Sequence, residues 1–375
     1  MSALQIAPEL SEPTMSPVLD HLTEDDVDEI GRRIDEIRDE ILAERGEADA
    51  AYIHRLIRIH RYLEISGRVT LLASILPPAW LTGTTLLSLA KIIENMELGH
   101  NIMHGQWDWM RDPEIHSTTW EWDNVATSED WKMTHNSMHH TWTNVLGKDE
   151  DVGYGRLRVT KDQEWEPEHL FQLATNLLLM TFFEYGISMY DSAVNSESIS
   201  HDGLDSRKKA ISKAWHKIKP QAFKDYVAFP LLSGISAPTT FAANFTANVV
   251  RNMWTHTVIF CGHFPDEVQY FTEDQVENES RGDWYIRQMM GSANIEGSEL
   301  FHTMTGNLSH QIEHHLFPDL PSNRYSEIAP RVREICDEYD LPYTTGRLSK
   351  QNFEVWRKLA VLSLPNDIID KLRLA

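Results

Sequence analysis

Three long stretches with almost no charge dominate the pattern of apolar and polar positions along the 375-residue chain. The first, residues 69–90, holds 22 uncharged residues, about the length that one bilayer crossing requires. Pro77 and Pro78 interrupt it. Since proline breaks helical hydrogen bonding, the pattern predicts a helical hairpin or a kinked span here rather than one straight helix. The arginines that precede this stretch favour a cytosolic flank.

The other two stretches each contain a single charged side chain. Residues 169–189 contain Glu184, and residues 226–265 contain Arg251. Only helices or closed barrels satisfy the backbone inside a bilayer, and long uninterrupted apolar runs are typical of helices. We therefore predict an all-α fold, an integral membrane helical bundle with about four transmembrane helices and a polar helical cap.

The first 50 residues follow a different pattern. Residues 1–20 have no apolar period and lack the basic-then-apolar order of a signal peptide, so we expect a flexible tail. Thr23 and Asp26 then form a capping-box pattern that opens a helix. Its apolar face has helical spacing and comprises Val27, Ile30, Ile34, Ile37 and Ile41. The predicted organisation is an acidic tail and amphipathic helix at 1–50, a membrane domain at 51–345 and a helical tail at 346–375.

Composition changes this picture only in part. The net charge of −23 and the mean hydropathy of −0.40, taken alone, describe a soluble acidic protein. Residues 1–50, however, hold 15 acidic and 4 basic side chains, a net −11, so nearly half of the charge belongs to one end. The acidic excess excludes nucleic acid as a partner because phosphates repel such a surface. Two cysteines, Cys261 and Cys336, are too few for a disulfide framework.

Histidine is the informative residue type. Eight of the 18 histidines fall into three groups, His100/His104, His135/His139/His140 and His310/His314/His315. In each group two histidines are four residues apart, which places both imidazoles on one face of a helix, where they can hold one metal ion. The adjacent His140 or His315 points about a quarter-turn away, toward a second metal ion.

Eight imidazoles exceed the three or four ligands of a single zinc site. They suit two metal ions that keep open positions for oxygen or water, although imidazole binds iron, copper, nickel and zinc alike. The three groups lie just outside the apolar stretches. We therefore expect them to gather on one membrane face, in a cytosolic cap.

The order of HxxxH, HxxxHH and QxxHH in an apolar chain resembles the membrane fatty-acid desaturase family over about residues 60–345. Residues 306–318 are the most specific part, because their QIEHHLFP core is similar to the third box of front-end desaturases and of actinobacterial acyl-coenzyme A Δ9 desaturases. Residues 148–151, KDED, also resemble the family. The resemblance implies a non-haem centre of two Fe²⁺ ions that uses O₂ to remove two hydrogens from a fatty acyl chain.

The resemblance also implies a ligand set, namely His100, His104, His135, His139, His140, Gln311, His314 and His315, with Gln311 where many relatives have histidine. One further histidine is expected from the last membrane helix, and we favour His263, at the apolar edge, over His256. His256 and Asn252 would then orient a ligand or hold a metal-bound water. His310 stands where relatives have an aromatic residue, so we expect it to fill space in the packing rather than to serve as an extra ligand. The metal centre itself carries the chemistry, and no side-chain acid or base is assigned.

Tryptophans concentrate between and beside the first two histidine groups. They are candidates for the wall of an acyl tunnel, with core packing or an interfacial aromatic belt as the alternative: Trp107, Trp109, Trp120, Trp131 and Trp142.

The expected substrate is a fatty acyl-coenzyme A or a lipid acyl chain, desaturated at Δ9. No GxGxxG fingerprint is present, so NADPH is expected to act only indirectly, through a separate reductase or ferredoxin. The expected location is the cell membrane, with the catalytic site on the cytosolic face. The alternatives are a front-end Δ5/Δ6-type desaturase, a membrane fatty-acid or alkane hydroxylase on the same scaffold, and a membrane metal transporter, which would need ionisable groups within the apolar stretches.

Overall fold

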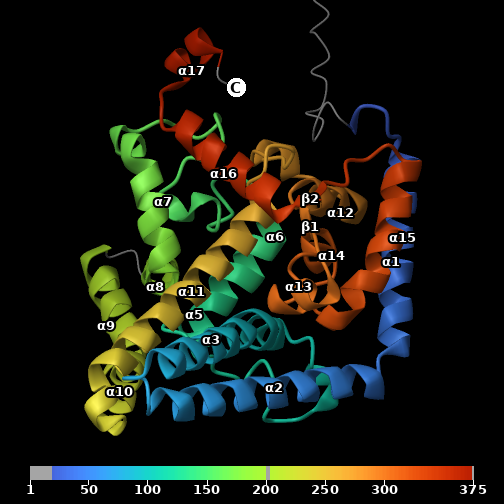
Figure 1. Ribbon diagram of the computed structural model, residues 1–375. Helices are drawn as coiled ribbons and strands as arrows, with labels where there is room; N and C mark the ends of the chain where they lie inside the picture. Colours follow the sequence, from blue (N-terminus) through green and yellow to red (C-terminus); the bar gives the residue numbers. More distant parts are fainter. Residues whose placement is uncertain (1–18, 200–202, 374–375) are drawn as a thin grey trace, which may run out of the picture.

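The structure, a computed structural model, describes residues 19–199 and 203–373 and is almost entirely helical (Figure 1). Residues 1–18, most of the predicted flexible tail, lie outside the described residues. The α-helices are α1 Glu24–Glu44, α2 Glu47–Leu71, α3 Pro77–Ile93, α4 Asn101–Met103, α5 Ser128–Trp131, α6 His140–Trp142, α7 Gln172–Thr181, α8 Phe183–Ile199, α9 Gly203–Phe223, α10 Phe229–Leu232, α11 Ala237–His263, α12 Arg281–Met290, α13 Glu299–Met304, α14 Gln311–Leu316, α15 Tyr325–Glu338, α16 Leu348–Leu362 and α17 Asn366–Leu372.

Shorter elements join these helices. The π-helical turns are η2 Glu94–His100, η4 Lys132–His139 and η7 Lys224–Ala228. The 3₁₀ turns are η3 Asp108–Met110, η5 Gly153–Gly155, η6 Pro167–Phe171, η8 Gly234–Ser236, η9 Asp274–Val276 and η10 Ser322–Arg324. Within the described residues, the one sheet pairs β1 Asn294–Glu296 with β2 Thr345–Arg347 in parallel.

A helical hairpin forms at the first apolar stretch, but most of its first helix, α2, precedes the stretch, which supplies the turn and most of α3. Helix α2 ends at Leu71, and the two prolines begin α3 at its first turn, where a missing backbone N–H costs no hydrogen bond. The two helices lie side by side along the lower edge of Figure 1, and α11 packs against α3.

The second and third stretches are also divided. Across Phe182 the segment Pro167–Thr181 meets Phe183–Val194 at a bend of 100°. The third stretch runs through η7, α10 and η8 into α11. Among the described residues no single helix is both long and apolar enough to cross a membrane, and that bent pair is the one combination that passes the same test together. The all-α prediction is confirmed, whereas the four transmembrane spans stay a prediction.

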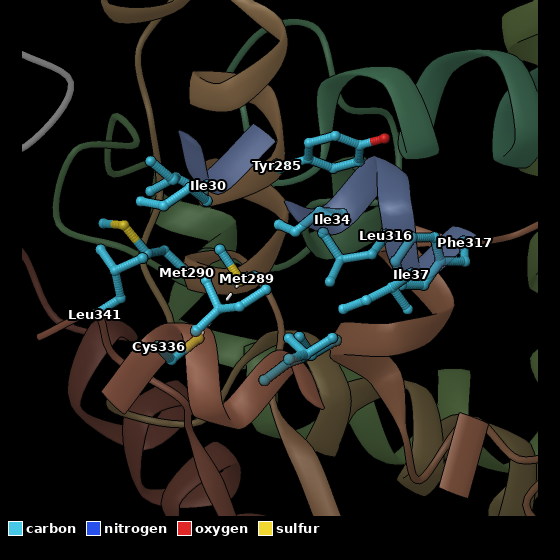
Figure 2. Close-up of a cluster of buried hydrophobic side chains, with 14 of the residues drawn as sticks. Ile30, Ile34, Ile37, Tyr285, Met289, Met290, Leu316, Phe317, Cys336 and Leu341 are labelled. Carbon is cyan, nitrogen blue, oxygen red and sulfur yellow. Dashed lines mark hydrogen bonds between the residues drawn. The ribbon is translucent and has the colours of Figure 1, made fainter. Parts of the chain in front are cut away.

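Helix α1 closes the main hydrophobic cluster. Its capping box forms as predicted between Thr23 and Asp26, and Ile30, Ile34 and Ile37 are buried. Figure 2 shows these isoleucines pointing toward Tyr285, Met289 and Met290 of α12, Leu316 of α14 and Cys336 of α15. The amphipathic N-terminal helix therefore contributes to the same core as the third histidine group.

Candidate metal centre

The first histidine group lies where α3 continues through η2 into α4. On one side of this segment Leu98 and Ile102 pack against Ile53 and Leu56 of α2, so the remaining face, with His100 and His104, points into the molecule. The imidazoles of His100 and His104 are neighbours, with ring centroids 4.7 Å apart. The expected sharing of one face holds, but on a backbone that is π-helical up to His100 instead of purely α-helical.

The second group is built in the same way. Thr127 caps α5, and the helix widens into η4, which carries His135 and His139. Trp131 stacks on the His135 ring at 4.4 Å. After the group, the buried Arg287 of α12 donates hydrogen bonds to the carbonyls of Thr141 and Thr143 and fixes the chain as it leaves the site.

The third group lies on α14. Ile312 and Leu316 belong to the main hydrophobic cluster, which turns His314 and His315 toward the other two groups. Strand β1 holds this helix, because Asn294 accepts a hydrogen bond from the backbone N–H of Ile312 at 2.9 Å and donates one to Glu313 at 2.9 Å.

The structure brings seven of the predicted ligands together in two clusters of imidazole nitrogens. Within each cluster the potential ligand atoms lie within 4.8 Å of one another, and the members are His100, His104, His135 and His314 in one cluster and His139, His263 and His315 in the other. His140 lies between the two clusters, since its ring centroid is 4.7 Å from that of His314 and 4.4 Å from that of His315.

Six of these eight rings have an oxygen beside their outward-facing nitrogen. In these six, Nδ1 lies at hydrogen-bond distance from an oxygen: His100 from Asn101 (3.1 Å), His135 from Asp151 (3.0 Å), His139 from Asp149 (3.0 Å), His263 from the Gly291 carbonyl (3.3 Å), His314 from Tyr325 (3.3 Å) and His315 from Thr143 (3.0 Å). An Nδ1 that donates a proton leaves the Nε2 lone pair free, which is the arrangement of histidine ligands in metalloproteins.

The inward-facing nitrogens show that a cation fits this site. The Nε2 atoms of His100 and His135 lie 3.2 Å apart, as do those of His263 and His315. With both Nδ1 atoms donating outward, two lone pairs face each other, an arrangement that a bound cation relieves. In addition, the buried Nε2 atoms of His104 and His314 and both ring nitrogens of His140 have no hydrogen-bond partner. The donor set therefore fits two metal ions.

Burial keeps most of these imidazoles neutral. It lowers the pKa of His100 to about 4, and burial together with neighbouring imidazoles holds the pKa values of His104, His135 and His314 well below the ordinary value. His139 differs, because the carboxylates of Asp149 and Asp151 outweigh the effect of burial and raise its pKa. Neutral imidazole is the form that binds metal, so the site is prepared for cations.

A third group of possible metal ligands consists of His135, His139 and Asp151, and it differs from the two clusters because it includes a carboxylate. The Asp151 carboxylate faces the outer nitrogens, 3.0 Å from His135 Nδ1 and 4.0 Å from His139 Nδ1. It therefore orients the His135 ring from outside the clusters, whereas Asp149, at 3.0 Å, orients the His139 ring. Glu313, which directly precedes His314, instead accepts hydrogen bonds from Tyr343 and Asn294.

Of the other site residues expected from the sequence, Gln311 lies beside a cluster, whereas His256, Asn252 and His310 do not belong to one. The carboxamide nitrogen of Gln311 lies 2.9 Å from His263 Nε2, beside the second cluster. His256 lies two turns before His263 on α11 and contacts Asn176 at 2.9 Å, and it belongs to no cluster found among the described residues. Asn252 donates to the Thr181 carbonyl. His310 lies against His302, with ring centroids 4.5 Å apart.

One cavity adjoins the first cluster, and it reveals site residues that the sequence did not single out. His100 and His135 line it together with Trp131, which is the one residue of the five tunnel candidates that lies on its wall. The others lie elsewhere: Trp107 stacks on Tyr52, Trp109 lies under Arg45, Trp120 packs between two hydrophobic clusters and Trp142 lies under Lys148. The apolar side chains that line this cavity but were not predicted from the sequence are Tyr154, Phe183, Ile187, Ile259 and Leu308.

Comparison with known proteins agrees with this geometry. The sequence profile of the fatty acid desaturase family matches residues 76–347. An NADPH-dependent stearoyl-CoA 9-desaturase of Mycobacterium tuberculosis is 50% identical over 353 residues, covering 93% of this chain and 83% of the relative. An sn-1 linoleoyl-lipid 6-desaturase of Synechocystis is 25% identical over 328 residues, covering 81% of this chain and 87% of the relative.

Proposed function

The chain belongs to the fatty acid desaturase family, and on that premise we propose that it forms a double bond at carbon 9 of a long-chain acyl-coenzyme A. It is an oxidoreductase that desaturates fatty acyl chains. The observation that carries the finer proposal is the 50% identity, over nearly the whole chain, to a relative that acts on stearoyl-CoA at position 9.

Two iron ions are the proposed cofactor. His100, His104, His135 and His314 would hold one ion, and His139, His263 and His315 the other, with His140 between them and Gln311 beside the second. When bound, the ions supply the reduction of O₂ and the removal of hydrogen from the acyl chain. Imidazole-rich sites with open positions are typical of such oxygen chemistry.

The chain's own residues orient the ligands and the substrate. Asp149 and Asp151 fix the His139 and His135 rings, and Trp131 stacks against His135. The apolar cavity wall formed by Tyr154, Phe183 and neighbouring side chains accepts an alkyl chain next to His100 and His135 and excludes water. Holding one pair of methylenes in register with the metal site supplies the positional selectivity.

Electrons would come from a separate reductase or ferredoxin, with NADPH as their indirect source. This proposal is supported by the NADPH dependence in the name of the 50% identical relative and by the lack of a GxGxxG fingerprint in this sequence.

We further propose that the protein is embedded in the cell membrane through the three apolar stretches, with the metal centre on the cytosolic face. Large apolar side chains are exposed along all three, and soluble monomers rarely expose apolar surface on this scale. They include Val69, Leu72, Leu81, Leu177, Leu178, Leu231, Leu232, Ile235, Phe241 and Phe245.

A front-end desaturase is the second candidate, favoured by the 25% identical 6-desaturase and by Gln311 in the third box. Metal transport loses its support, because the two charges inside the apolar stretches, Glu184 and Arg251, pair with each other.

The decisive experiment expresses the chain with a reductase and its electron carrier in a host that lacks desaturases. We expect oleoyl products from stearoyl substrates and about two irons per purified chain, the number that the two imidazole clusters would hold. A double bond at Δ5 or Δ6 would identify the front-end activity, and a hydroxylated product would identify the hydroxylase. Unchanged fatty acids from an iron-loaded protein would refute the desaturase proposal.

A further inference from the structure

The two charges inside the apolar stretches form a buried ion pair. Arg251 of α11 lies 2.6 Å from the Glu184 carboxylate of α8, and both side chains are buried. Arg251 also donates to the Asn252 side chain at 3.0 Å and to the Asp123 carbonyl at 3.4 Å. Charges in such surroundings are costly and are retained where they serve a purpose.

This pair stands where two cavities meet. The inner cavity extends from His100 and His135 of the metal site to Glu184, Arg251 and Asn252. A second cavity, on the far side, is also lined by Glu184 and Asn252. Its remaining wall is mostly aromatic and reaches the molecular surface, because several of its side chains are exposed: Phe182, Phe241 and Phe245.

The bend between α7 and α8 holds this partition in place. Asn252 donates a hydrogen bond to the carbonyl of Thr181, the last residue of α7, at 3.1 Å. This contact fixes the 100° bend, and α8 then begins with Glu184 in its first turn, facing Arg251. The ion pair and the bend are therefore held by neighbouring residues, since Arg251 binds Glu184 and Asn252 binds Thr181.

We propose that Glu184, Arg251 and Asn252 form the end wall of the acyl cavity and so determine the longest alkyl segment accepted beyond the metal centre. This inference rests on the proposed function. Methylenes cannot replace the partner of either charge, so an alkyl chain that passed the wall would leave buried charges unpaired. The chain end must therefore stop in front of the pair, although an apolar cavity continues behind it.

The test measures relative kcat/KM for saturated acyl-coenzyme A substrates of increasing length. The variant Glu184→Ala/Arg251→Ala removes both charges together, so neither remains unpaired, and it joins the two cavities. We expect preference for the longer substrates to rise by about tenfold, the discrimination that one or two methylenes produce in an apolar pocket. The double-bond position, counted from the thioester, should not change.

The matched control is Glu184→Leu/Arg251→Met, which is equally uncharged but keeps the volume filled, and it should retain the wild-type length preference. A second variant, Ile187→Phe, narrows the inner cavity one turn away on α8 without touching the ion pair. It should shift the preference toward shorter chains, which tests the wall even where the double variant fails to fold.

The outcomes separate the two proposals. An iron-loaded alanine double variant with the wild-type length profile, or an Ile187→Phe enzyme with that profile, would overturn the end wall while the desaturase assignment stands. A wild-type protein that desaturates no acyl-coenzyme A, despite bound iron and a working reductase, would overturn the proposed function and the end wall with it.

Discussion

At the scale of the residue, the orientation of each imidazole distinguishes the proposed metal ligands from the other histidines. In six of the eight clustered rings Nδ1 lies beside an oxygen acceptor, and the Nε2 atoms of His100 and His135 face each other at 3.2 Å. His310 has no such geometry, because it lies against His302 and outside both clusters. We therefore propose different roles for His310 and His314, which are four residues apart in the third box, in line with the expectation from the sequence that His310 is not a ligand.

His314→Ala should abolish desaturation and lower the iron content, because it removes one of four imidazoles around the proposed first ion. His310→Ala, from the same box, should keep both within about twofold, because His310 belongs to neither cluster and substitutions away from such features usually have small effects. Metal analysis of the purified variants, together with product analysis, tests the difference. Full iron occupancy in His314→Ala would show that the ligand set is wrong.

Asp151→Ala should weaken the site without removing a ligand. Its carboxylate accepts from His135 Nδ1 at 3.0 Å and so fixes the tautomer and the ring. Loss of such an orienting group typically costs 10–100-fold in metal affinity or activity, so we expect about that loss in a competition with an iron chelator. Asp162→Ala, on an exposed loop, is the control. Equal iron affinity in the two variants would contradict this role for Asp151.

At the scale of the element, the sequence predicted much of the site but not the backbone that carries it. Spacing correctly predicted that His100 and His104 share a face, and the prolines correctly predicted the α2–α3 hairpin. The π-helical turns η2 and η4 were not foreseen, because residue propensities and histidine spacing do not register an i→i+5 hydrogen bond. The division of the histidines into two clusters depends on tertiary contacts and cannot be read from spacing.

Gly306 illustrates how tightly the elements carrying the first and third histidine groups approach each other. It has φ +69°, and a Cβ there would lie 2.3 Å from the Met96 carbonyl of η2. Gly306→Ala should therefore displace η2, lower the melting temperature and reduce iron binding. Gly234→Ala is the matched control, because Gly234 has φ +57° but no atom within 4 Å of the added Cβ. It should cost only the backbone strain, about 1–2 kcal/mol. Equal losses in both variants would rule out the steric explanation.

At the scale of the whole molecule, the mean hydropathy and net charge do not reveal that polar and apolar surfaces occupy separate regions. The low mean hydropathy reflects the acidic first 50 residues and the polar cap, while the apolar side chains exposed on α3, α7, α10 and α11 belong to the three uncharged stretches. Helix α11 connects the two regions, since it starts beside α10 at the lower left of Figure 1 and brings His263 into the second cluster. The residue that the sequence favoured over His256, His263, is thus the one that lies in a cluster.

The proposed membrane placement can be tested with single cysteines. Leu232 is 73% exposed and belongs to α10, the helix at the lower left of Figure 1, whereas Asp367 belongs to α17, the helix at the top. The native Cys261 and Cys336 are buried, and burial raises the pKa of Cys336 to about 12, so neither should react with a thiol probe.

A fluorescent probe on Leu232→Cys, in protein reconstituted into lipid vesicles, should be quenched several-fold more by a lipid-borne quencher than by aqueous iodide. The physical reason is that an exposed leucine at this tip gains most from contact with acyl chains. The same probe on Asp367→Cys should show the reverse order, because α17 follows the polar cap rather than an apolar stretch. Quenching of the Leu232 probe by iodide alone would place α10 in water and would contradict the membrane proposal.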